Sequence, residues 1–229
     1  MSHKPQTHRD PKWKKRYFGI GAILLVIAAL SIMLWALSED EREVTFPYFA
    51  EGDKIEITQL FQYSGFNPDC GDEMGENIAS LAVVNRSNEH LSYLELSVDV
   101  LDGGDMVFEI TDLPAGQTAW VFSKDNLSCE MDAVVRDIDC TAKFEIGDPM
   151  MTDKIQTQVS GTTVFLTNLT GEDLTDLTVS CRTWFGEAYF GGLTYQYPVD
   201  SLPAGQTVTL EAEDCYLGEA AVVRISEKG

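Results

Sequence analysis

The apolar residues follow two different patterns along the chain. Residues 17–38 form one uninterrupted run of twenty-two residues without a charge. Beyond this run, apolar and polar positions alternate in short stretches; Leu94, Leu96 and Val98, for example, are separated by single polar residues. A period of two is typical of half-buried β-strands, and no helix is predicted after residue 38. In the first half of this part, strands are predicted at about 54–63, 77–85, 91–101, 105–111, 117–123 and 131–140.

The apolar run at 17–38 predicts a transmembrane helix. At about 1.5 Å per residue it reaches about 33 Å, enough to cross a hydrocarbon core of about 30 Å. Trp13, Tyr17 and Trp35 lie near its ends, where aromatic side chains favour the membrane interface. Residues 1–16 contain six Lys or Arg and one acid, so the positive-inside rule places this tail in the cytoplasm and the rest of the chain outside.

A cleaved signal peptide is the alternative to an anchor. Ala36 and Ser38 are small residues at the two positions that a signal peptidase reads. The apolar run is longer than the usual hydrophobic region of about 7–15 residues in signal peptides, which favours the anchor.

The part beyond residue 38 contains an internal duplication. Leu113-Pro-Ala-Gly-Gln-Thr118 recurs as Leu202-Pro-Ala-Gly-Gln-Thr207, and Ala133-Val-Val-Arg136 recurs as Ala221-Val-Val-Arg224. Short alternating strands separated by Pro-Ala-Gly turns are typical of sandwiches. The predicted fold class is all-β, with two tandem immunoglobulin-like β-sandwich domains after a single N-terminal transmembrane helix. The predicted parts are a cytoplasmic basic tail (1–16), the transmembrane helix (17–38), an acidic juxtamembrane stalk (39–53), β-sandwich repeat 1 (54–146), a linker (147–153) and β-sandwich repeat 2 (154–229).

A Val-x-Asn element at Val83, an alternating strand that ends in Leu101-Asp102-Gly103, and the Leu-Pro-Ala-Gly-Gln-Thr turn occur in this order. This arrangement resembles the FxLYD-type family of bacterial extracytoplasmic immunoglobulin-like sandwiches, over about residues 80–123 and again over 163–211. At the aromatic and tyrosine positions of that family, this chain has Val98 and Leu101. The resemblance implies a sandwich fold and a location in the cell envelope, and it brings no catalytic residues.

Five cysteines, all beyond the membrane segment, are typical of an oxidising compartment. If the strands alternate in direction, Cys70 and Cys129 lie at one end of repeat 1, and Cys181 and Cys215 lie at the same end of repeat 2. Two disulfides are therefore predicted, Cys70–Cys129 and Cys181–Cys215, with Cys140 free. Buried reduced cysteines are the alternative, since free cysteine is a common core residue.

Charge and motifs narrow the classes of function. From residue 39 onward, ten basic residues face thirty-six acidic ones, a net charge of −26, which excludes nucleic acid as a partner. The hydrolase, zinc-protease and phosphate-loop motifs do not occur in the sequence. The outer part has one histidine, His90, which is predicted to lie in a surface turn. No catalytic, metal or cofactor site is predicted.

Three Asn-x-Ser/Thr sequences begin at Asn85, Asn126 and Asn168. In a eukaryotic secretory route they would accept glycans. Asn85 and Asn168 hold equivalent repeat positions at a strand end, where Asn and Ser or Thr also form turns.

One segment of repeat 2, Trp184–Tyr197, is longer than its counterpart and contains six aromatic residues. Aromatic residues exposed on a loop mark binding sites for proteins, or for sugars that stack on the rings. The predicted partner-binding residues are Trp184, Phe185, Tyr189 and Phe190, of which Tyr189 and Phe190 are expected farthest from the paired strands. The alternative is that these rings pack the hairpin and the contact between the repeats.

The function predicted from these features is that of a membrane-anchored extracytoplasmic protein that presents its sandwich domains for protein binding or for envelope assembly, without catalysis. An envelope enzyme and a sensor that acts through a membrane partner are the alternatives. A protein partner in the envelope is expected, and a carbohydrate ligand stays open.

Protease added to intact cells is expected to remove residues 39–229 and to leave a small membrane-bound fragment, because only the outer part is accessible. An N-terminal tag and immunoblotting measure this, with permeabilised cells as the control in which the tag is also lost. Recovery of all the protein in soluble form, beginning at Glu39, would establish the signal peptide instead.

Overall fold

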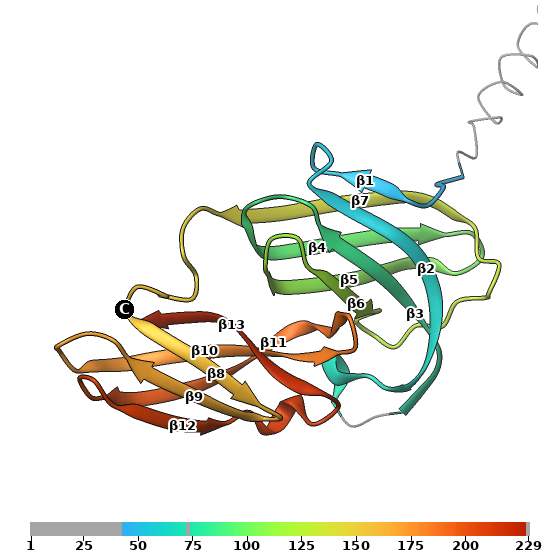
Figure 1. The fold of residues 1–229 in the computed structure, drawn as a ribbon. Helices are drawn as coiled ribbons and strands as arrows, with labels where there is room; N and C mark the ends of the chain where they lie inside the picture. The colour runs from blue at the N-terminus through green and yellow to red at the C-terminus, as the bar shows by residue number, and fades with distance from the viewer. Residues whose placement is uncertain (1–42, 72–73, 228–229) are drawn as a thin grey trace, which may run out of the picture. The chain divides into compact units, whose positions relative to one another are not determined.

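Strands form nearly all the regular structure in residues 43–71 and 74–227, the part of the chain that the computed structural model describes (Figure 1). Strand β1 (Tyr48–Ala50) precedes the first repeat, which contributes β2 (Ile55–Phe66), β3 (Met74–Asn85), β4 (His90–Val100), β5 (Gly104–Leu113), β6 (Thr118–Phe122) and β7 (Val135–Glu145). The second contributes β8 (Ile155–Ser160), β9 (Thr163–Asn168), β10 (Leu174–Phe185), β11 (Ala188–Leu202), β12 (Thr207–Glu211) and β13 (Glu219–Glu227).

The all-β prediction is confirmed for the described residues. Helical structure there is limited to two 3-10 turns of three residues, η1 (Pro68–Cys70) and η2 (Glu213–Cys215). The six strands predicted for repeat 1 are present, with ends shifted by a few residues. The difference is β1, which lies within the predicted stalk; Phe46 and Tyr48 pack against the core of repeat 1, and this burial makes the segment part of the fold.

The predicted membrane segment 17–38 and the basic tail 1–16 lie outside the described residues. Within residues 43–71 and 74–227, no helix has both the length and the hydropathy needed to cross a bilayer.

The two repeats use the same turns. In each Leu-Pro-Ala-Gly-Gln-Thr sequence, the backbone N–H of the glutamine donates to the backbone carbonyl oxygen of the proline, at 3.2 Å in repeat 1 and 3.0 Å in repeat 2. The glycine has a positive φ in both, +72° at Gly116 and +68° at Gly205, a conformation that glycine adopts without steric cost. The repeated sequence therefore encodes a repeated backbone geometry.

Asn85 and Asn168 close equivalent turns and are buried, with 0% and 1% of each residue exposed. Each side-chain amide donates to two backbone oxygens at 2.8–3.0 Å; the acceptors are Glu89 and Leu113 for Asn85, and Glu172 and Leu202 for Asn168. A glycan on either nitrogen would remove one of these donors and would have to be buried. In the folded protein these two asparagines act as turn residues.

Three sheets form two layered cores. One seven-stranded sheet has the order β1-β2-β3-β6-β11-β10-β13 and so contains strands of both repeats (Figure 1). The sheet β5-β4-β7 packs against its repeat 1 part, and the sheet β12-β9-β8 packs against its repeat 2 part. Along β13, Ala220 and Val222 contact the second core, whereas Ala221 and Val223 contact the first. The two smaller sheets therefore cover opposite faces of the shared sheet.

The repeats join where β6 pairs in parallel with β11, with Tyr189 opposite Ala119 and Phe190 opposite Trp120. Just beyond this pairing, β11 bulges out of its register with β10. Cys181 pairs with Tyr195 and Thr183 with Phe190, so that residues 191–194 leave the ladder.

The bulge is held by the carboxylate of Asp69 from η1. One Asp69 oxygen accepts from the Gly192 amide at 2.6 Å, and the other accepts from the Leu193 amide at 2.9 Å. Burial raises the pKa of Asp69, while the two amides and the nearby Arg182 guanidinium act in the opposite direction. Tyr195 adds a hydrogen bond from its hydroxyl to the carbonyl oxygen of Pro68 at 3.0 Å.

Arg182 of β10 also binds the bulge. Its guanidinium donates to the carbonyl oxygens of Thr111 (3.0 Å) and Gly191, and it lies 5.0 Å from the centre of the Tyr189 ring. Complete burial lowers its pKa to about 10, and its Nε has no hydrogen-bond partner within the described residues. A buried cation with these partners binds β5, β10 and β11 together.

Gly192→Ala is expected to lower the free energy of unfolding by about 3 kcal/mol, because overpacking at a close backbone contact forces the repeats apart. A Cβ atom at this position would collide with the Glu109 carbonyl oxygen. Chemical denaturation measures the loss. Gly171→Ala is the control, since its Cβ would meet no atom within 4 Å. Equal stability of the two variants would contradict the tight junction.

Candidate functional site

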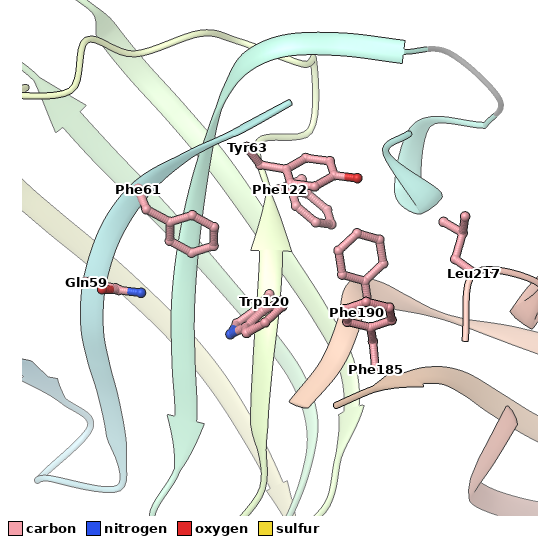
Figure 2. Close-up of a pocket in the computed structure, with 8 residues that line it drawn as sticks. All are labelled: Gln59, Phe61, Tyr63, Trp120, Phe122, Phe185, Phe190 and Leu217. Atoms are coloured by element: carbon pink, nitrogen blue, oxygen red, sulfur yellow. The ribbon is translucent and has the colours of Figure 1, made fainter. Parts of the chain in front are cut away.

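An apolar groove lies on the shared sheet at the junction of the repeats, on the face opposite the first core (Figure 2). Its volume is about 300 Å³, at the lower end of the range for ligand pockets. Its lining residues are Gln59, Phe61 and Tyr63 of β2, Trp120 and Phe122 of β6, Phe185 of β10, Phe190 of β11, and Leu217 after η2.

Strand alternation places these rings. On β6, Ala119 and Val121 contact the first core, so Trp120 and Phe122 point to the other face. Phe190 pairs with Trp120 across the β6–β11 junction and joins the same face. Each repeat therefore supplies one wall of the groove.

The rings meet mostly edge to face. Phe190 lies at the centre of the cluster, 5.0 Å from Phe122, 5.5 Å from Tyr63 and 6.5 Å from Trp120 between ring centroids, with interplanar angles of 68°, 74° and 77°. These are favourable T-shaped contacts, and they leave rings standing at steep angles to one another instead of forming one flat platform.

Few polar groups reach the groove. The Tyr63 hydroxyl already donates to the Phe66 carbonyl oxygen at 3.1 Å. The Gln59 amide and the Trp120 indole N–H lie at the same end of the groove in Figure 2. Within the described residues neither forms a hydrogen bond, so both are available to a ligand.

The structure separates the four predicted partner-binding residues into two pairs. Phe185, which is 50% exposed, and Phe190 line the groove. Trp184 and Tyr189 point to the opposite face, where their rings lie 5.0 Å apart and pack against the first core.

The prediction that Tyr189 and Phe190 lie farthest from the paired strands was wrong. Both are strand residues that pair with β10 and with β6, Tyr189 is 6% exposed, and Gly186 and Glu187 form the tip of the hairpin instead. Gly191 and Gly192, which follow in the same strand, are packed closely against repeat 1. Trp184 and Tyr189 therefore follow the alternative prediction, in which the rings pack the contact between the repeats.

Four groove residues were missed by the sequence analysis: Phe61, Tyr63, Trp120 and Phe122. In the sequence they appear as ordinary strand positions. The available signal was the spacing of Phe61-x-Tyr63 and Trp120-x-Phe122, which puts large rings at positions where alternation predicts solvent exposure.

Neither predicted disulfide is formed in the structure. Cys129, Cys181 and Cys215 are buried thiols, and Cys140 is a half-buried one. The Cys70 loop closes onto repeat 2 through Asp69, and the Cys70 thiol donates to the Lys124 carbonyl oxygen at 3.0 Å instead of meeting Cys129.

The alternative of reduced core cysteines therefore describes the structure at Cys129, Cys181 and Cys215. Burial raises the pKa of Cys181 to about 12 and those of Cys140 and Cys215 to about 11. Such values disfavour the reactive thiolate.

A cluster of polar side chains from both repeats forms a second contact between them. His90 was predicted in a surface turn, but it is 5% exposed because its Nε2 lies 3.1 Å from the carboxylate of Asp112. The same carboxylate accepts from Arg224 of β13 at 2.6 Å, and Arg224 also pairs with Glu145 at 2.8 Å. Burial acts to raise the pKa of Asp112, but the hydrogen bonds from His90 and Arg224 outweigh it, so this pKa lies below its usual value.

The described residues contain no group of three or more potential ligands that could hold a metal ion. Compared with protein-family models and with curated proteins, the chain matches none of them. The FxLYD-type resemblance stays a prediction from the sequence.

Asp112→Asn is expected to lower the free energy of unfolding by about 3 kcal/mol at pH 7, because the Arg224 charge loses its buried partner. The folded-state pKa of Asp112 is lowered, so its stabilising effect is present above the unfolded value of about 3.9 and is lost as the pH falls through the folded value. The difference between wild type and variant should therefore shrink in acid.

Asp99→Asn is the matched control for denaturation curves at several pH values. Asp99 pairs at 3.7 Å with Arg136, the repeat 1 counterpart of Arg224, and both side chains are exposed. Such a pair contributes about 0–1 kcal/mol. An Asp112→Asn loss as small as the control, or one that grows in acid, would contradict the buried ion pair.

Proposed function

We propose that this protein is a membrane-anchored binding protein of the cell envelope. Residues 17–38 hold it as a single-pass protein with its N-terminus in the cytoplasm. The two repeats, as immunoglobulin-like sandwiches, stand outside and dock a protein partner in the aromatic groove. No catalysis is part of this proposal.

The observation that carries the proposal is the groove itself. Six aromatic rings gather on one face of the shared sheet, and Phe185 keeps half of its surface exposed to solvent. Aromatic anchors surrounded by other apolar groups dominate the energetics of protein interfaces.

The chemistry of the lining favours a protein over a carbohydrate. A sugar needs a flat ring to stack on and several polar groups for its hydroxyls. Here the rings stand at steep angles, and Gln59 is the one lining residue with a side-chain amide. With a net charge of −26 on residues 39–229, a partner with a basic and apolar docking segment is the complementary one.

Photo-crosslinking in cells that make the protein tests the docking site. With p-benzoylphenylalanine in place of Phe185, illumination is expected to give one discrete crosslinked species, because this ring would contact the bound partner. The position tolerates the change, being 50% exposed.

The matched control is the same replacement at Phe49, which is 41% exposed and does not line the groove. Mass spectrometry identifies the crosslinked protein. Equal yields at both positions, or none at Phe185, would contradict docking at the groove.

A further inference from the structure

The hydrogen-bonding capacity of the groove restricts what it binds. Its lining contains no charged side chain, and the free polar groups within the described residues are the Gln59 amide and the Trp120 indole N–H. An ordinary extended peptide would bury several backbone N–H groups on these rings without acceptors, which costs free energy for each of them. A ligand with carbonyl groups but few N–H groups avoids this cost.

Proline-rich segments have this composition, since proline has no backbone N–H and is itself apolar. They also adopt the polyproline II helix before binding, so less entropy is lost on docking. Grooves lined with aromatic rings bind such segments by placing proline rings between the aromatic ones. In this groove Phe190 stands at a steep angle to each of its neighbours Tyr63, Phe122 and Trp120, so the rings do not form one flat surface.

The position of Trp120 fits the same ligand. Its ring forms part of the groove wall, with the indole nitrogen at the end near Gln59 (Figure 2). An indole N–H is a donor only, and the carbonyl oxygens of a polyproline II helix point outward without internal partners. Trp120 can therefore donate to a carbonyl while its ring contacts a proline.

The negative charge around the groove favours basic residues at the two ends of a bound proline-rich segment. Glu187 is exposed at the hairpin tip, between groove residue Phe185 and β11. The outer part as a whole has a net charge of −26, so basic residues flanking the prolines would be attracted and acidic ones repelled.

We propose that the groove binds a proline-rich segment of a partner protein in the polyproline II conformation, flanked by arginine or lysine. The inference rests on the proposed function, because it names the ligand of the same docking site. It assigns the apolar contacts to Phe185 and Phe190, and a hydrogen bond to the Trp120 indole.

Isothermal titration with the full-length chain in detergent tests this. The probe is the peptide acetyl-Arg-Pro-Pro-Pro-Pro-Pro-Arg-amide. The expected dissociation constant is about 1 mM or lower, in the range of a small interface. A peptide with alanine in place of every proline should bind at least about tenfold more weakly, and one with glutamate in place of both arginines should also bind more weakly.

Variants of the chain locate the binding. Phe185→Ala removes an exposed groove ring and Trp120→Phe removes the indole N–H while keeping a ring; each should weaken binding of the proline peptide about tenfold or more. Phe49→Ala, an exposed aromatic outside the groove, should leave it unchanged. Thermal unfolding verifies that the variants remain folded.

Equal binding of the proline and alanine peptides, or no binding of the proline peptide, would overturn the proposal. If the proline peptide fails while a partner still crosslinks at Phe185, the groove is a docking site for another kind of segment. If neither occurs, the proposed function fails as well. If the chain self-associates and Phe185→Ala abolishes this, the groove is an interface between two copies of the chain. If the glutamate peptide binds as tightly as the arginine peptide, the preference for flanking basic residues is wrong.

Discussion

The placement of the two repeats depends on one buried carboxylate. Asp69 accepts hydrogen bonds from the Gly192 and Leu193 amides, which the bulge in β11 has released from the strand ladder. A buried carboxylate without donors is costly, so repeat 1 can close on repeat 2 only where these amides converge. The turn that carries Asp69 has no counterpart in repeat 2, whose β8 and β9 are joined by a short turn at Gly161. The segments in which the repeats differ are therefore the ones that join them.

Local sequence patterns predict the strands well, because each strand's alternation depends on its own residues. The Pro-Ala-Gly turns and the Asn85 and Asn168 positions are equally local, and the structure confirms them in both repeats. The shared sheet could not be predicted in this way. It depends on the pairing of Tyr189 with Ala119, two residues that no local pattern connects. The pairing of two edge strands from different repeats leaves no mark in the alternation of either strand.

The same limit explains the site. Divergence between the repeats drew attention to Phe185 and Phe190, which line the groove, because an unexplained aromatic segment was visible in the sequence; that they bind a partner stays a prediction. The sequence could not show that Tyr189 differs from these two residues, because the position of the bulge decides to which face of the sheet each side chain points. His90 shows the converse error: its neighbours in the sequence are typical of a turn, yet it is buried against Asp112 of the neighbouring strand β5, which in turn binds Arg224 of β13. Burial that comes from other elements is not readable from flanking residues.

The groove exists only because the two repeats share one sheet whose opposite faces are covered by the two smaller sheets. In a separate two-layer domain, one face of each sheet packs in the core and the other meets solvent. Here the smaller sheets cover opposite faces of the shared sheet, so the uncovered face of repeat 1 runs on to the hairpin of repeat 2. Phe190 thereby stands beside Trp120, and neither repeat alone has both walls. Asp69 and Arg182 fix that arrangement, so a ligand of the kind proposed would meet ordered walls, and the entropy lost on its binding would be correspondingly smaller.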